Sequence, residues 1–266
     1  MQPAHAVVLG IVEGLTEFLP LSSTGHLILA SHALGLRGEA VKSFEIVIQA
    51  GALVAVAWLY RARLAQVWRG AGGRDPAGWA LGRNLLLSFL PAAAAGGLLH
   101  RLIKALLFNP TMVAAALAAG GALMLAVDRR SRGPAGRGTD TLTAREAALI
   151  GLWQCLALWP GMSRAMVTIV GGLLMGLSPA AAAEYSFLLA LPTLGLATLY
   201  EAALGGRALL HDLGAASIAA GFAVTIVVAA AAIRGFLRYL TRGGLAPFGW
   251  YRLALAGAVW WLLRPI

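Results

Sequence analysis

The sequence predicts an all-α polytopic membrane protein that forms one integral membrane domain across residues 1–266. Hydrophobic residues make up 59% of the chain, charged residues only 12%, and the mean hydropathy is +0.78. Long apolar stretches recur from one end to the other, and no polar stretch of domain size remains between them. This composition is typical of chains whose helices cross a bilayer several times.

Six apolar stretches are each long enough to cross a hydrocarbon core of about 30 Å as a helix. They lie at 44–60, 84–100, 111–128, 184–204, 213–233 and 248–264. Arginines gather in two segments between them, 61–83 and 129–145, which favours a cytoplasmic location for both. The formal net charge of +10 therefore reflects topology, and we expect no nucleic-acid partner.

Two further apolar stretches, 6–35 and 146–178, are each interrupted near the middle by a proline and a polar cluster. Pro20 precedes Leu-Ser-Ser-Thr-Gly, and Pro160 precedes Gly-Met-Ser-Arg. A proline followed by small polar residues ends one helix and lets the next begin. Because irregular backbone at membrane depth survives only inside protein or beside a wet cavity, both stretches are predicted to be re-entrant helix–turn–helix hairpins.

The two hairpins resemble each other, since residues 10–13 (GIVE) can be aligned with residues 151–154 (GLWQ). Each half then contains one hairpin and three spans, with repeat 1 at about 1–128 and repeat 2 at about 143–266. Three is an odd number, so the second half starts from the opposite side of the membrane. The sequence therefore predicts an inverted-topology repeat whose broken helices meet near the midplane and direct their N-terminal ends at an anion.

Glu13 and Glu17 stand four residues apart in the first hairpin, which places both carboxylates on one face of a helix. Together they can bind a divalent cation or hold a proton. An ionised carboxylate at the bilayer centre costs roughly 2.5–3.5 kcal/mol, so selection for stability alone does not favour two of them. The alternative is that both lie at the interface and solvate a helix end.

Ser22, Ser23, Thr24 and Gly25 fill the turn and the start of the next helix, where free N–H groups and hydroxyls can contact a phosphate. Gly25 lets the backbone approach closely. For any one hydroxyl, an ordinary helix cap is the alternative. His26 follows directly and is a candidate general acid or base, although a lone histidine is often a packing residue.

On the second hairpin, Ser163 and Arg164 present a hydroxyl and a guanidinium at a helix start, a pair suited to binding phosphate oxygens. The alternative is that Arg164 only pairs with Glu13 or Glu184. If the hairpins meet, the site contains two carboxylates, several hydroxyls, a histidine and an arginine. This set predicts metal-assisted phosphoryl chemistry within a membrane.

Two long motifs, GIVEGLTEFLPLSSTGHLI and QCLALWPGMSRAMVTIVGGLLMG, are each followed by a shorter one, FEIVIQAG and AAEYSFLLALP. Together they resemble the BacA-type undecaprenyl-diphosphatase family, the bacitracin-resistance phosphatases that recycle the bacterial cell-wall lipid carrier. The resemblance covers nearly the whole chain. It implies hydrolysis of undecaprenyl diphosphate to the monophosphate and inorganic phosphate, assisted by Mg²⁺ or Ca²⁺. It also implies the bacterial cytoplasmic membrane, with the active site on the outer, periplasmic side.

The resemblance further implies that the family's site positions fall on residues already singled out. The matched residues are Glu13, Glu17, Ser22, Ser23, Thr24, His26, Ser163 and Arg164. Glu13 and Glu17 are then expected to hold the metal against the diphosphate, while Arg164 neutralises its terminal phosphate. His26 activates either Ser23 as the nucleophile or a water. We expect substrate contacts from the remaining hydroxyls and from Gly25.

The chain departs from the family at one point, and two other functions stay open. The family usually continues its second motif as Pro-Gly-x-Ser-Arg-Ser-Gly, whereas Ala165 and Met166 follow Arg164 here. A transporter or flippase could move polyprenyl phosphate lipid without hydrolysis, since inverted repeats suit alternating access. An ion or proton carrier could use Glu13 and Glu17 as a relay. The expected partners are a polyprenyl diphosphate lipid and the bilayer, with a homodimer left open.

Overall fold

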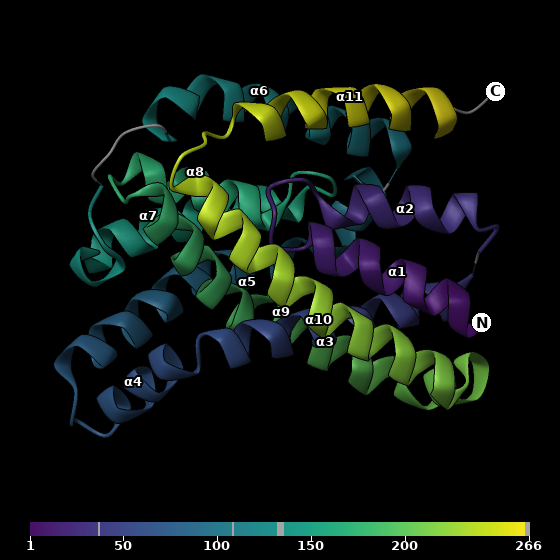
Figure 1. The fold of residues 1–266 in the computed structure, drawn as a ribbon, viewed down its shortest axis with the longest axis horizontal. Helices are drawn as coiled ribbons and strands as arrows, with labels where there is room; N and C mark the ends of the chain where they lie inside the picture. Colours follow the sequence, from purple (N-terminus) through teal and green to yellow (C-terminus); the bar gives the residue numbers. More distant parts are fainter. Residues whose placement is uncertain (37, 108, 132–135, 264–266) are drawn as a thin grey trace.

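The computed structural model describes residues 1–36, 38–107, 109–131 and 136–263, and this part of the chain is helical with no β-strand (Figure 1). The α-helices are α1 Pro3–Thr16, α2 Ser23–Ala33, α3 Glu39–Leu59, α4 Arg61–Ala71, α5 Pro76–Leu107, α6 Pro110–Ser131, α7 Ala144–Gln154, α8 Arg164–Leu174, α9 Pro179–Leu213, α10 Ala215–Leu240 and α11 Ala246–Leu263. Short 3₁₀ helices at Thr139–Thr141 and Cys155–Leu158 flank α7. The predicted all-α class is confirmed.

Within the described residues, three helices contain stretches that are long and apolar enough to cross a membrane. These stretches are Pro110–Asp128, Pro179–Tyr200 and Ala215–Leu240. Two bent pairs of helical segments bring the number to five if each pair is one span. The pairs are Phe44–Leu59 with Arg61–Ala71, bent by 77°, and Pro76–Leu99 with Arg101–Leu107, bent by 68°. The chain is thus a multi-pass membrane protein, and the predicted count of six spans, with α11 as the sixth, stays a prediction.

Two predicted boundaries differ from the structure. Segment 61–83, predicted as a basic loop, is mostly helical: α4 is followed by a short turn, where Gly73 has a φ of 73°, and then by α5. The span predicted at 184–204 continues as helix to Leu213, and the chain turns only at Gly214, whose φ of 76° favours glycine. Part of the other basic segment, at 132–135, lies outside the described residues.

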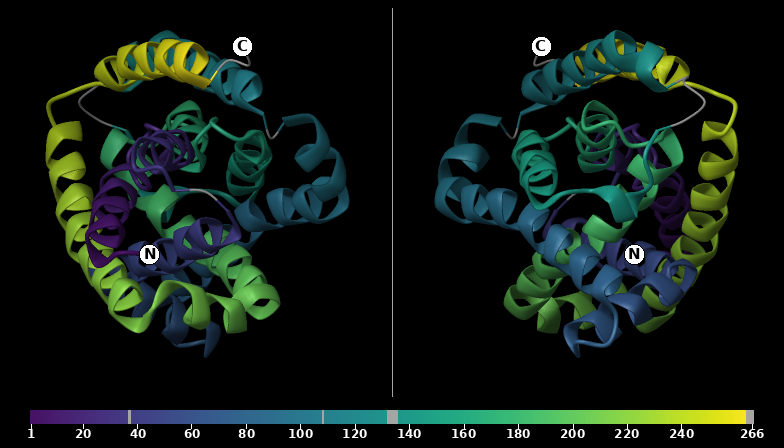
Figure 2. Two further views of the ribbon diagram at one scale, coloured as in Figure 1. Left: turned by 90° about the vertical axis from the view of Figure 1, so that its right-hand side faces the viewer. Right: turned by 90° about the vertical axis from the view of Figure 1, so that its left-hand side faces the viewer.

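The helices pack in pairs that recur on the two sides of the molecule. Helix α1 packs on α10, and α7 packs on α5; α2 contacts α11, and α8 contacts α6. Helix α3 contacts α9. Helix α11 lies along α6, as both views of Figure 2 show. Small residues allow the close approaches: a Cβ on Gly10 would lie 2.7 Å from the Gly221 carbonyl oxygen, and a Cβ on Gly121 would lie 2.8 Å from that of Gly249.

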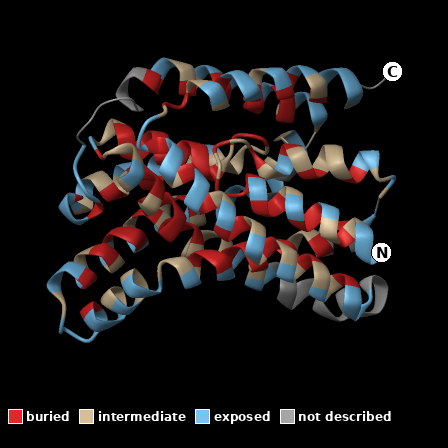
Figure 3. Cartoon of the chain, in the orientation of Figure 1, coloured by how far each residue is buried: buried red, intermediate tan, exposed pale blue. Residues whose placement is uncertain are grey.

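Burial is concentrated where the broken helices meet. Every residue of α8 from Arg164 to Leu173 is buried, and buried residues line the inward faces of the surrounding helices (Figure 3). Large apolar side chains such as Leu98, Val227 and Trp250 are exposed on the outward faces. An apolar exterior of this kind is stable against lipid and not against water, which fits the membrane location.

Candidate functional site

An ion pair joins the two helix–turn–helix segments, α1–α2 and α7–α8, that the sequence predicts as hairpins; that these hairpins are re-entrant stays a prediction. The Arg164 guanidinium donates from Nη2 to Oε1 of Glu17 at 2.8 Å, and both side chains are buried. Nη1 of Arg164 donates to the carbonyl oxygen of Ser186 at 3.1 Å, and the guanidinium lies over the ring of Phe18, 5.5 Å from its centroid. The end of α1 and the start of α8 are thus held together by a charge-assisted hydrogen bond in an apolar surrounding.

Ser23 contacts the same carboxylate. Its hydroxyl donates to Oε2 of Glu17 at 2.5 Å, so both Glu17 oxygens accept a hydrogen bond, one from each hairpin. Ser23 is the first residue of α2 and is partly exposed, whereas Thr24 beside it is exposed. The structure therefore brings Glu17, Ser23 and Arg164 into one connected chain of side chains.

Ser22 and Ser163 occupy equivalent places in the two turns. Each directly precedes its helix, and each has a positive φ, 76° for Ser22 and 71° for Ser163. Among the described residues these are the two non-glycine residues with positive φ, a conformation that costs about 1–3 kcal/mol each. Each hydroxyl caps its helix, Ser22 accepting from the N–H of Gly25 at 3.4 Å and Ser163 from that of Met166 at 3.2 Å.

His26 lies one turn along α2, but it does not contact Ser23. Its Nδ1 lies 2.8 Å from the carbonyl oxygen of Ser22, and its Nε2 lies 2.7 Å from the hydroxyl of Tyr251. The His26 and Tyr251 rings are stacked with centroids 5.6 Å apart. Because an N–H at Nδ1 fits the carbonyl, Nε2 is then the acceptor for the tyrosine hydroxyl. In this arrangement the side chain that accepts the Ser23 hydroxyl is the Glu17 carboxylate.

Glu13 lies one turn before Glu17 and is 1% exposed. Its Oε2 is buried without a hydrogen-bond partner. A buried, unpartnered carboxylate oxygen is costly unless something else binds it. Glu184, named with Glu13 as an alternative partner for Arg164, instead accepts from Nε of Arg63 at 3.0 Å and lies outside this cluster.

A divalent cation fits these carboxylates when substrate supplies further ligands. Among the described residues no group of three or more His, Cys, Asp or Glu side chains is placed to hold a metal ion. Mg²⁺, however, is commonly bound through one or two carboxylates and the phosphates of a substrate. Glu13, with its unpartnered oxygen, and the adjacent Glu17 meet that requirement.

Arg252 in α11 is a further buried cation, and the sequence analysis did not select it. Its side chain is fully buried. Nη2 lies 2.8 Å from the carbonyl oxygen of Gly161, 3.1 Å from that of Met162 and 3.2 Å from that of Ala116. Nη1 reaches the carbonyl of Pro20 at 3.5 Å. An arginine inside an otherwise apolar stretch is costly at membrane depth, and this cost is the signal in the sequence by which Arg252 could have been found.

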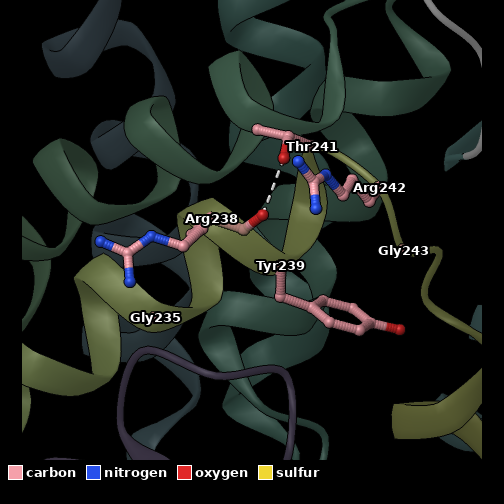
Figure 4. Close-up of a pocket in the computed structure, with 6 residues that line it drawn as sticks. All are labelled: Gly235, Arg238, Tyr239, Thr241, Arg242 and Gly243. Atoms are coloured by element: carbon pink, nitrogen blue, oxygen red, sulfur yellow. Dashed lines mark hydrogen bonds between the residues drawn. The ribbon is translucent and has the colours of Figure 1, made fainter.

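A surface pocket of about 550 Å³ lies elsewhere, at the end of α10 (Figure 4). It is lined by Gly235, Arg238, Tyr239, Thr241, Arg242 and Gly243. None of the residues selected from the sequence lines it. The site argued here is therefore the cluster between the two turns, and the pocket is separate from it.

The fold and the cluster define a class: multi-pass helical membrane proteins that bury carboxylates, hydroxyls and a guanidinium between two broken helices. The chain belongs to the family described as bacitracin resistance protein BacA, whose model matches residues 6–258. It is 53% identical to an undecaprenyl-diphosphatase of Sorangium cellulosum over 97% of this chain and 85% of the relative. It is 48% identical to an undecaprenyl-diphosphatase of Rhizorhabdus wittichii over 97% of both chains, and 48% identical to undecaprenyl-diphosphatase 2 of Rhodospirillum rubrum over 94% of this chain and 90% of that one.

Proposed function

We propose that this protein hydrolyses undecaprenyl diphosphate to undecaprenyl phosphate and inorganic phosphate, and so recycles the lipid carrier of cell-wall synthesis. The observation that carries the proposal is the connected group Ser23, Glu17 and Arg164, which combines a nucleophile, a base and a phosphate-binding cation between two broken helices. Its relatives over nearly the whole chain bear the name undecaprenyl-diphosphatase.

Ser23 is the proposed nucleophile and Glu17 its base. As the Ser23 oxygen bonds to the terminal phosphorus, its proton passes to Oε2 of Glu17, 2.5 Å away, and the bond to the bridging oxygen breaks. Undecaprenyl phosphate leaves, and water then hydrolyses the phosphoserine to release inorganic phosphate. A water at the same position, activated by Glu17, is the alternative attacker.

Arg164 and the start of α8 bind the phosphate that is transferred. A guanidinium matches phosphate oxygens with two parallel hydrogen bonds, and the first N–H groups of a helix favour an anion. Ser163 and the first turn, with Ser22, Thr24 and Gly25, contribute hydroxyls and backbone N–H groups from the two sides. Fixed donors in a water-poor site stabilise the charge that develops during transfer.

Glu13 and Glu17 are the proposed ligands of Mg²⁺ or Ca²⁺. The unpartnered Oε2 of Glu13 supports this assignment. A divalent cation bound there would neutralise charge on the diphosphate oxygens. His26, whose ring nitrogens contact Ser22 and Tyr251, keeps its proposed place in the catalytic set, and it supports the first turn through the Ser22 carbonyl.

The membrane arrangement belongs to the same proposal. We place the protein in the bacterial cytoplasmic membrane, with six spans, two re-entrant hairpins and the site open to the periplasmic side. The recurring helix pairs, α1 with α10 beside α7 with α5, support an inverted repeat of residues 1–128 and 143–266. A homodimer stays a prediction, for which light scattering of the detergent-solubilised protein is the measurement.

The test is phosphate release from undecaprenyl diphosphate by the purified protein in detergent, with Mg²⁺ and with a chelator. Wild type should release phosphate only with the metal, and Glu17→Gln and Arg164→Ala should abolish release. Because each variant removes one partner of a buried ion pair, circular dichroism of each checks that it is folded. A folded wild type that releases no phosphate would overturn the proposal. Movement of lipid phosphate across vesicles in that case would establish the flippase alternative.

A further inference from the structure

Arg252 connects the backbones of the two hairpin turns. Its guanidinium contacts the Gly161 and Met162 carbonyls of the second turn and reaches the Pro20 carbonyl of the first. A fourth contact, with the Ala116 carbonyl, attaches it to α6. The carbonyls of Pro20, Gly161 and Met162 lie in the turns, outside the regular helices, whereas Ala116 lies within α6. Nη2 shares its two N–H groups among three carbonyls and Nη1 reaches the first turn, so one planar group contacts backbone acceptors on both sides of the site.

The surrounding structure is shaped to admit this guanidinium. A Cβ on Gly120 of α6 would lie 2.4 Å from Nη2 of Arg252, so glycine is needed there for the side chain to fit. The ion pairs found among the described residues leave Arg252 without a carboxylate partner, and its Nε is buried without an acceptor. A cation buried against carbonyl groups alone lowers the stability of the fold. This cost indicates that Arg252 contributes to function and not to stability.

Tyr251, the preceding residue, contacts the functional cluster directly. Its hydroxyl lies 2.7 Å from Nε2 of His26, and its ring is parallel to the imidazole within 2°. The stacked ring fixes the plane of the imidazole, and the hydroxyl fixes which ring nitrogen carries the proton. Two consecutive residues of α11 thus hold a side chain of the first hairpin and the backbones of both.

We propose that Tyr251 and Arg252 form a clamp on α11 that positions the two turns for phosphoryl transfer. Arg252 sets the separation of the turns, and Tyr251 sets the orientation and tautomer of His26. Both are positioning residues, because they act through the turns and through His26. The expected effect of the clamp on the rate of phosphate release rests on the proposed function. Its effect on the backbone of the two turns can be measured without substrate.

The clamp is tested with Arg252→Lys and Tyr251→Phe in the purified full chain. The matched controls are Arg238→Lys and Tyr239→Phe on α10; Tyr239 also donates its hydroxyl to a carbonyl, that of Gly244 at 3.0 Å, but far from the turns. Backbone hydrogen–deuterium exchange is measured at residues 18–26 and 158–166, because local exchange reports local opening. In the same preparations kcat and KM are measured for phosphate release.

Arg252→Lys should speed exchange in both turns and lower kcat by roughly 10–100-fold with little change in KM, since lysine cannot span the separated carbonyls. Tyr251→Phe keeps the ring and should lower kcat by about 3–10-fold. If Tyr251 acts through His26, Tyr251→Phe should cause no further loss of kcat when His26→Gln is also present. A purely structural role of Tyr251 would instead lower kcat equally with and without His26→Gln. The controls should leave exchange in the turns unchanged.

Unchanged exchange in both turns with Arg252→Lys would overturn the clamp, as would equal losses from Tyr251→Phe with and without His26→Gln. Should wild type release no phosphate, the proposed function fails. Exchange in the turns then decides the clamp alone: faster exchange with Arg252→Lys, absent with Arg238→Lys, supports it. Tyr251→Phe removes one oxygen atom, so it remains a fair test even where Arg252→Lys fails to fold.

Discussion

Glu17 and Arg164 are 147 residues apart in the chain, and their side chains meet at 2.8 Å in the buried centre of the protein. The contact joins the end of α1, in the first helix–turn–helix segment, to the start of α8, in the second. The same carboxylate accepts the hydroxyl of Ser23 through its other oxygen. A single acidic side chain thus links the phosphate-binding cation to the proposed nucleophile, and several measurable consequences follow.

Arg164→Lys tests whether the positive charge is sufficient for activity or whether the planar shape of the guanidinium is also needed. Lysine keeps the positive charge but loses the planar fork, so kcat should fall by about 10²–10³-fold, the usual effect of removing a fixed donor to a developing anion. Phosphate release from undecaprenyl diphosphate measures this. Arg63→Lys, which alters the ion pair with Glu184, is the matched control and should leave kcat unchanged. Equal losses in both variants would contradict a special role for Arg164.

Ser23→Ala should remove activity if the hydroxyl is the nucleophile. Ser22→Ala removes a cap and should lower stability by about 1 kcal/mol, since Ser22 accepts the Gly25 N–H, and it should also raise KM because a proposed phosphate contact is lost. Rapid quenching followed by mass spectrometry should find phosphate on Ser23 in wild type. Full activity of Ser23→Ala would exclude the covalent route and leave the water activated by Glu17.

Glu13→Gln should weaken the response to metal. The amide keeps the size of the side chain but removes the charge, so the Mg²⁺ concentration for half-maximal rate should rise by about tenfold or more. A Mg²⁺ titration of phosphate release measures the change. Glu184→Gln, whose carboxylate pairs with Arg63, should leave the titration midpoint in place. A midpoint unaffected by Glu13→Gln would remove Glu13 from the metal site.

Met166 stands where the family usually has glycine, and the structure explains why this chain needs its bulk. Met166 is fully buried, and its methyl carbon lies 2.8 Å from where a Cβ on Gly120 would be. Met166→Gly should therefore leave a cavity beside Gly120 and lower the free energy of unfolding by about 2–5 kcal/mol. Met166→Leu, which keeps the volume, should cost less than about 1.5 kcal/mol. Unfolding in detergent measures both, and an undiminished stability of Met166→Gly would contradict this explanation.

The residues of the candidate site could be predicted from the sequence because they are polar groups in an otherwise apolar chain. Glu13, Glu17 and Arg164 carry a high cost at membrane depth, and the prolines at 20 and 160 mark where helices break. The helical class follows from the same composition. These features depend on local sequence alone, which is why no structure was needed to find them.

The pairing of these residues could not be predicted, because it depends on how distant helices pack. Arg164 had Glu13 and Glu184 as alternative partners, and the approach of α1 to α8 selects Glu17 instead. Glu184 contacts Arg63 because α4 is a helix where a loop was expected. His26 was expected to activate either Ser23 or a water, and this role stays a prediction. The position of α11 gives its Nε2 the hydroxyl of Tyr251 as a partner. Each outcome is set by contacts between segments more than 100 residues apart.

On the proposed function, the double use of the Glu17 carboxylate predicts how substrate enters. In the resting protein Arg164 already has a counter-ion, so an incoming phosphate exchanges places with a carboxylate and does not meet a bare cation. The affinity for phosphate then depends on the difference in free energy between the Arg164–phosphate pair and the Arg164–Glu17 pair, which keeps this affinity moderate. When phosphate departs, Glu17 returns to Arg164 and competes with rebinding. In each turnover, phosphate therefore replaces the Glu17 carboxylate on the Arg164 guanidinium, and Glu17 then displaces the product. This exchange favours release of inorganic phosphate.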